Sequence, residues 1–206
     1  MENDVKEFLS ELLKQLKSID YIKPEDIPNI DLYMDQVTTF MDEQLAASKR
    51  YESDKILTKT MINNYAKNNL LPSPDKKKYS KEHVLTLLFI YYFKNILSIN
   101  DIRSILNPLT EKYFGNDDGF TMQDVYTEVF GLEAEESQKL LKDLGKKYKN
   151  AGETFEDFPA EDQKFLHTFS FICMLSFDVY IKKMLIERMI DDLNEEKEAS
   201  KKTGSN

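Results

Sequence analysis

The side chains best suited to sequence-specific recognition lie together between positions 58 and 67. The run reads Thr58-Lys59-Thr60-Met61-Ile62-Asn63-Asn64-Tyr65-Ala66-Lys67. Asn and Thr are poor residues for a helix interior, because their side chains compete for backbone hydrogen bonds. Two adjacent asparagines on a short helix therefore indicate an exposed face with a binding role. Since Asn pairs bidentately with adenine in the major groove and Lys neutralises phosphates, we predict that this run contacts double-stranded DNA.

A second cluster of positive charge follows in the run Asp75-Lys76-Lys77-Lys78. Residues 55–81 carry seven lysines and one acid, a local charge of +6 in a chain whose net charge is -9, so the rest of the chain stands at -15. Such segregation suits a small DNA-contacting unit on an acidic body. Charge alone leaves one alternative open, a solvated lysine face without a partner.

The other residues that could form a catalytic or metal site lack the spacing that such sites require. His83 and His167 stand far apart without metal-spaced partners, and Cys173 lies in an apolar run where a thiol behaves as a small hydrophobe. Residues 116–119, Asn-Asp-Asp-Gly, lack the alternating oxygen ligands of a calcium loop and are interpreted as a polar turn. The sequence has no glycine-rich phosphate loop. We therefore expect neither an enzyme, a cofactor nor a metal site.

Composition places the chain among cytoplasmic all-α proteins. Its 206 residues are 41% hydrophobic, enough for a real core, and long stretches carry helical spacing. A single cysteine excludes an internal disulfide, and the acidic N-terminus lacks the features of a signal peptide. The charge-free run at residues 165–177 is short of the roughly 20 residues that span a membrane, so we predict a buried helix or a dimer seam and no membrane association.

The elements that must position the 58–67 run can be predicted from apolar spacing and end signals. We expect an amphipathic helix at residues 5–16 and a second helix at residues 32–45. The 57–67 helix should end at Asn68-Asn69, because Asn tolerates the left-handed conformation. Ser80 should then cap a core helix at residues 81–96. A capping box at residues 98–101 should start a short helix that ends at Asn107-Pro108.

The second half of the sequence predicts a separate helical unit. Residues 121–124 should cap a helix that runs to residue 130, and another helix is expected at residues 133–149. Pro159 should open a last helix reaching residue 193. The Met and aromatic side chains of that helix fit either a ligand pocket or packing in a core or dimer, and we favour packing. The predicted domains are residues 1–28 (amphipathic helix and connector), 29–107 (DNA-binding), 108–193 (dimerisation or effector) and 194–206 (disordered tail).

The order of motifs from residue 62 to 106 resembles the winged-helix domain of MerR-type bacterial regulators, within what looks like an uncharacterised bacterial family of transcriptional regulators. Tyr65 matches the second aromatic of that family's recognition helix, and residues 70–72, Leu-Leu-Pro, match its following turn. Tyr79 matches the last tyrosine of the wing, and residues 98–102 match the start of the next helix. The chain departs from the family at Asn63 and Asn64, which replace an arginine and an aromatic, and in a shorter wing of lysines.

The resemblance implies a winged helix-turn-helix unit, whose wing is either a small two-stranded hairpin or a loop, followed by a helical C-terminal domain. We expect Asn63 or Asn64 to read base edges and the lysines to hold phosphates. The predicted DNA-contacting residues are Thr58, Lys59, Thr60, Asn63, Asn64, Lys67, Lys76, Lys77, Lys78 and Tyr79. We also expect a homodimer that presents two recognition helices about 34 Å apart. The sequence does not show whether a small-molecule effector binds.

The alternative is a protein-interaction module built on the same fold. A DNA reader should present a positive, polar face around Tyr65 and Tyr79, whereas a protein-binding module should expose an apolar patch there.

Overall fold

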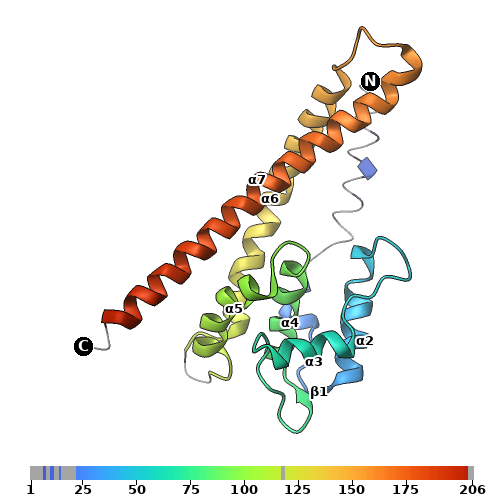
Figure 1. The fold of residues 1–206 in the computed structure, drawn as a ribbon. Helices are drawn as coiled ribbons and strands as arrows, with labels where there is room; N and C mark the ends of the chain where they lie inside the picture. Colours follow the sequence, from blue (N-terminus) through green and yellow to red (C-terminus); the bar gives the residue numbers. More distant parts are fainter. Residues whose placement is uncertain (1–6, 8–9, 12–13, 15–21, 117–118, 204–206) are drawn as a thin grey trace. The chain divides into compact units, whose positions relative to one another are not determined.

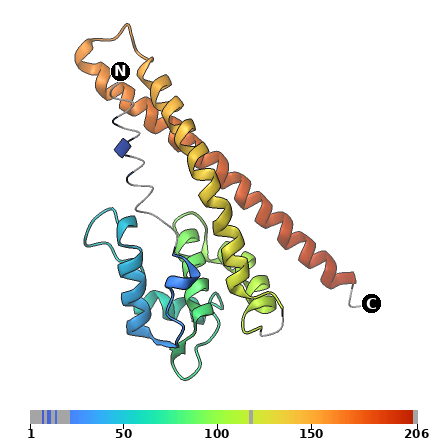
Figure 2. The same ribbon diagram turned by 180° about the vertical axis from the view of Figure 1, so that it is seen from behind.

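The computed structural model describes residues 7, 10, 11, 14, 22–116 and 119–203. The described chain is mostly helical and contains one sheet of two short strands, which confirms the all-α prediction at that level (Figures 1 and 2). Most of the predicted helix at residues 5–16 lies outside the described residues. The chain divides into two compact units, Tyr21–Phe130 with Ile186–Asn206, and Met1–Asp20 with Gly131–Leu185. The boundaries therefore differ from the predicted ones at 28, 107 and 193.

The first unit, which we call the core unit, gathers its helices around α4. Its elements are η1 (Pro24–Asp26), β1 (Leu32–Tyr33), α2 (Met34–Gln44), η2 (Ala46–Ser48), α3 (Lys59–Lys67), β2 (Lys78–Tyr79), α4 (Lys81–Phe93), α5 (Ile99–Tyr113), the first turns of α6 (Met122–Gly152) and the last turns of α7 (Ala160–Thr203). Nine consecutive residues of α4, His83 to Tyr91, are buried, as its all-round apolar sequence predicts. The predicted caps form at Ser98 and Thr121, each paired with an Asp three residues later.

The sheet is small but fixes the start of α2. β1 pairs with β2 in antiparallel register, Leu32 opposite Tyr79 and Tyr33 opposite Lys78. The predicted helix at residues 32–45 therefore begins two residues later than expected. The side chain of Gln36 accepts a hydrogen bond from the Tyr33 N–H (2.8 Å), which caps α2 and leaves Leu32 and Tyr33 extended.

Pro108 does not end its helix, contrary to the prediction. α5 continues to Tyr113 although a proline cannot donate to the carbonyl four residues earlier. That carbonyl, on Ser104, instead accepts a hydrogen bond from the ammonium of Lys197 at 2.7 Å. A side chain distant in sequence thus replaces the missing backbone donor, which local sequence rules do not anticipate.

Two long helices form most of the other unit, which we call the hairpin unit. α6 runs through Gly131 to Gly152, so the two helices predicted at 121–130 and 133–149 are one. α7 (Ala160–Thr203) continues ten residues past the predicted end at 193, so the prediction of a disordered tail is wrong for residues 194–203. Within this unit the end of α6 and the start of α7 lie side by side (Figures 1 and 2). Their contact includes a Lys147–Asp178 ion pair and the rings of Tyr148 and Phe171, whose centres are 5.3 Å apart.

Among the residues that the structure describes, no helix is long and apolar enough to cross a membrane.

Candidate nucleic-acid interface

Both ends of α3 are capped by hydrogen bonds that its own sequence and the residues flanking it provide. Thr58 is the N-cap, and its side-chain oxygen accepts a hydrogen bond from the Met61 N–H (3.2 Å). At the other end Asn69 adopts the left-handed conformation (φ 55°), as predicted. The Leu70 N–H donates to the Tyr65 carbonyl (2.9 Å) and the Asn69 N–H to that of Ala66 (3.2 Å), which is a Schellman motif. Both ends of α3 are therefore defined by the local sequence.

The loop that leads into α3 is tied to the central helix α4. Lys94 donates from its ammonium to the Ile56 carbonyl (2.6 Å), and burial lowers the pKa of that ammonium. Ser48 and Tyr91 share a hydrogen bond between their hydroxyls at the other end of the connection. These contacts hold α3 on the core although residues 45–58, which join it to α2, form a long connection.

One side of α3 is buried and the opposite side is polar and exposed. Ile62 and Tyr65 pack into the core. The exposed side, which we call the α3 face, comprises Lys59, Thr60, Asn63, Asn64 and Lys67. At 3.6 residues per turn these positions cover a continuous arc of about 140°. In the described part of the chain, the side chains of Asn63 and Asn64 have no hydrogen-bond partner, so both amides are available to a ligand.

The lysine cluster forms a tight turn, which we call the lysine hairpin (Asp75–Lys78). Asp75 and Lys78 form an antiparallel bridge closed by a 2.8 Å hydrogen bond from the Lys78 N–H to the Asp75 carbonyl. The two central residues, Lys76 and Lys77, have φ values of 46° and 65°. This is the type I′ pattern, in which Asn and Gly are the favoured residues. Lysines at both positions cost stability, because a residue with a Cβ atom is strained at positive φ.

The turn that carries the hairpin protrudes from the core unit in both views (Figures 1 and 2). Lys76 and Lys77 are exposed, whereas Lys78 is half-buried with its ammonium 5.6 Å from the ring centre of Tyr33. Tyr33 itself is 55% exposed on β1. Sequence reasoning missed Tyr33 as a member of this surface, because only the register that pairs it with Lys78 brings it there.

Most of the predicted contact residues lie on these two surfaces, with two corrections. Tyr79 is 3% exposed and packs in the core, so it is not available to a duplex. Thr58 uses its hydroxyl as the helix cap, which assigns it to positioning α3. Lys59 is exposed but forms an ion pair with Asp35. Exposed pairs of this kind contribute little stability and exchange readily for a phosphate.

His83 is a structural residue at the start of α4. Its Nδ1 accepts a hydrogen bond from the Ser80 N–H (3.0 Å), so His takes the place of Glu in a capping box. The ring is buried against Tyr79 and Phe114, and Nε2 has no hydrogen-bond partner within the described chain. Burial lowers the pKa of His83, and the nearby backbone of Ser73 and the negative charge of Asp31 oppose this shift only in part.

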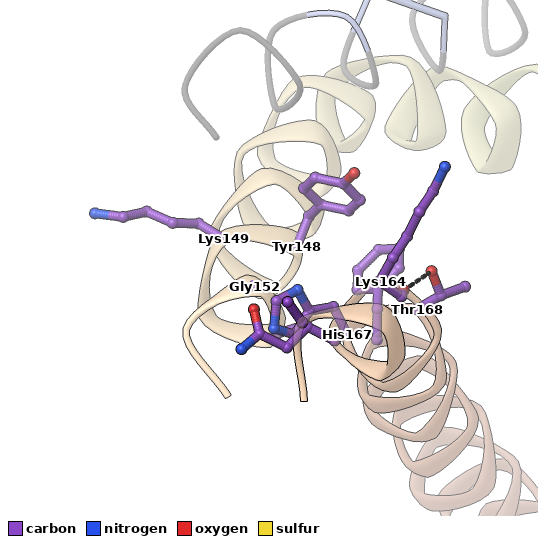
Figure 3. A pocket seen from close by; sticks show the side chains of 10 residues that line it. Tyr148, Lys149, Gly152, Lys164, His167 and Thr168 are labelled. Carbon is purple, nitrogen blue, oxygen red and sulfur yellow. Dashed lines mark hydrogen bonds between the residues drawn. The ribbon is translucent and has the colours of Figure 1, made fainter. Parts of the chain in front are cut away.

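A pocket of about 630 Å³ lies in the hairpin unit, between the end of α6 and the start of α7 (Figure 3). It is lined by Tyr148, Lys149, Ala151, Gly152, Ala160, Gln163, Lys164, His167, Thr168 and Phe171. His167 is hydrogen-bonded through Nε2 to the Thr154 carbonyl (2.8 Å), and Lys149 points away from the hollow. No carboxylate is among these lining residues.

The described residues contain no cluster of three or more His, Cys, Asp or Glu that could hold a metal ion. Cys173 is exposed on α7, so of the two predictions for residues 165–177, a buried helix or a dimer seam, burial within the described chain does not hold at this position.

Comparison with known proteins gives one match. Residues 22–129 match the model of a family described as a domain of unknown function, DUF1836. This range includes α3, the lysine hairpin and α4. No curated protein and no solved structure matches the chain.

Proposed function

The chain belongs to the DUF1836 family, and we propose that it is a transcriptional regulator that binds double-stranded DNA in a sequence-specific manner through the α3 face and the lysine hairpin. The observation that carries this proposal is the α3 face itself. It presents two amides, Asn63 and Asn64, that have no hydrogen-bond partner among the described residues, between Lys59 and Lys67 on a helix whose other side is buried.

The chemistry of the α3 face fits the major groove. That groove is about 12 Å wide and admits one helix, and an Asn amide can donate and accept at the same adenine edge. Lys59 and Lys67 lie two turns apart at either end of the asparagines, where they would hold phosphates and fix the position of the helix. In this arrangement Asn63 and Asn64 supply specificity and the lysines supply affinity.

The lysine hairpin adds a second contact to backbone. Lys76 and Lys77 place two adjacent ammonium groups on a rigid turn, and the exposed hydroxyphenyl ring of Tyr33 lies beside the neighbouring Lys78. We assign Lys76 and Lys77 to phosphate contacts, because the lysine ammonium is a point charge and lacks the bidentate donor geometry of arginine. Lys78 supports the hairpin through its contact with Tyr33.

We further propose that β1, α2, α3, the lysine hairpin and α4 form a winged helix-turn-helix. The order of these elements and the antiparallel pairing of β1 with the strand after the hairpin support the assignment. The connection at residues 45–58 is longer than the usual turn of three or four residues. Its anchoring through Ile56 and Ser48 accounts for how α3 keeps a fixed orientation despite this length.

The alternative of a protein-binding module predicts an exposed apolar patch around Tyr65 and Tyr79. Both rings are instead buried, and the α3 face and the lysine hairpin beside them expose polar and basic side chains, with Tyr33 as an exposed aromatic ring at their edge. This distribution favours DNA over a protein partner at this face.

Binding of the full chain to a fluorescent duplex of random sequence tests the proposal. The variant Asn63→Ala/Asn64→Ala should keep this nonspecific binding, whereas Lys59→Ala/Lys67→Ala should weaken it. Lys142→Ala/Lys146→Ala, which removes the same charge from exposed positions on α6, should leave it unchanged. Equal weakening by both lysine pairs would show that net charge alone, and not the α3 face, determines binding.

A further inference from the structure

The helix α7 carries an apolar stripe that nothing in the described chain covers. This surface, which we call the outer stripe, consists of the exposed residues Phe165, Phe169, Ile172, Cys173, Val179 and Tyr180. At 3.6 residues per turn they lie on one side of α7 and extend along about 24 Å of it. The residues that face α6, among them Phe171 and Asp178, lie on the opposite side. α7 therefore carries apolar side chains on more than one side; Phe171 is buried on the side that faces α6, whereas the outer stripe is exposed.

We propose that the outer stripe is a homodimer interface, in which α7 pairs with α7 of a second copy of this chain in antiparallel orientation. The proposal does not rest on DNA binding. It concerns the hairpin unit alone, and it can be tested independently of the function proposed for the α3 face.

The exposed area matches what a dimer needs. With about 150–200 Å² per full-sized apolar side chain, the stripe and its neighbours Phe177 and Met184 expose on the order of 700 Å². The largest apolar patch on a monomer is usually about 300–600 Å². A standard interface buries about 800 Å² on each partner. The area thus exceeds the usual monomer patch and approaches one side of a stable interface.

The sequence of the stripe is complementary to itself when reversed. Antiparallel pairing with its two-fold axis between Ile172 and Cys173 places Phe165 opposite Tyr180 and Phe169 opposite the small Ser176. The same pairing sets the acidic Asp162 at one end opposite the basic Lys183 at the other. A parallel pair in register would oppose Asp162 to Asp162 and Lys183 to Lys183, which is repulsive. Size and charge therefore both select a second antiparallel copy as the occupant.

The oligomeric state of the full chain tests the interface. The wild-type protein should sediment as a dimer at micromolar concentration. Phe169→Glu places a charge in the centre of the stripe and should raise the dissociation constant at least about 30-fold, the size of a hot-spot loss. Phe158→Glu is the matched control, because Phe158 has the same 51% exposure outside the stripe. It should leave the dimer intact. Circular dichroism should show unchanged helix content in both variants.

Two results would overturn the interface. One is a monomeric wild-type chain at tens of micromolar, as expected if another segment of the same chain covers the stripe. The other is equal dissociation by Phe158→Glu and Phe169→Glu, which would place the contact elsewhere.

The single cysteine allows the orientation to be measured. A spin label on Cys173 should lie close to its copy, within about 20 Å, near the two-fold axis. A label on Glu161→Cys in a Cys173→Ser background should lie about 35 Å from its copy, since each site is 11.5 residues from the axis at 1.5 Å per residue. Short distances at both positions would show a parallel pair and contradict the proposal, as would a long distance at Cys173.

Discussion

The lysine hairpin offers the sharpest quantitative prediction. Replacing Lys76 by Asn and Lys77 by Gly removes two charges and installs the pair of residues that the type I′ turn prefers. Unlike substitution by alanine, this change relieves backbone strain, so the hairpin should be at least as stable as in the wild type. Any loss of binding then reports the charges and not the fold of the turn.

The expected loss follows from counterion release. Each lysine that neutralises a phosphate contributes about 0.9 to the slope of log K against log salt concentration. Lys76 and Lys77 are exposed, whereas Lys78 is half-buried over Tyr33. We therefore expect the slope to become shallower by about 1.8. If the wild type and the double variant have equal affinities near 1 M salt, the affinity of the variant at 0.1 M salt should be lower by a factor of about 60.

The assay is fluorescence anisotropy of a labelled duplex at salt concentrations from 50 to about 300 mM, a range over which such slopes are resolved. Lys142→Gln/Lys146→Gln provides a control with the same net charge, because both residues are exposed on α6. It should retain the wild-type slope. An unchanged slope in Lys76→Asn/Lys77→Gly would remove the hairpin from the contact surface and refute the reasoning.

Three further predictions concern stability and specificity. Asn69→Ala should destabilise the chain by about 1 kcal/mol in urea unfolding and Asn69→Gly should not, because only the alanine is strained at φ 55°; equal effects would show that the Schellman turn does not limit stability. Because the folded pKa of His83 lies below its usual 6.5, the unfolded chain binds the proton first. Stability should thus be complete above pH 6.5 and decline as pH falls through that value. His83→Gln should reduce this loss of stability at low pH, and the control His167→Gln should retain it. The opposite result would show that His83 does not cause the pH dependence. Asn64→Ala should relax base preference at an adenine in a selected site and cost about 1–3 kcal/mol there, with little change on random DNA, whereas uniform weakening would make the residue a nonspecific contact.

Local signals in the sequence predicted the elements around α3 well. The end of α3 at Asn69, the caps at Ser98 and Thr121 and the buried α4 all follow from short-range rules, since each depends on residues within one or two turns. The α3 face could be predicted for the same reason. Its exposed and buried positions are fixed by helix period once the helix itself is placed.

Features that depend on distant partners could not be predicted in this way. α5 continues through Pro108 because Lys197 supplies the donor, and Tyr33 joins the lysine hairpin because β1 pairs with β2. The burial of Tyr79 follows from the same pairing, which places it opposite Leu32 in the core. A two-residue strand is too short to give an alternating pattern, so no signal in the sequence could have moved Tyr79 from the contact surface to the core.

Selection of bound sequences from a pool of random duplex DNA, repeated at several salt concentrations with the full chain, tests the central claim most directly. The proposed function predicts enrichment of a defined site with a steep salt dependence, and loss of that enrichment in Asn63→Ala/Asn64→Ala. Weak binding at low salt without enrichment of any sequence would contradict it, and would leave the α3 face as a basic surface that reads no base.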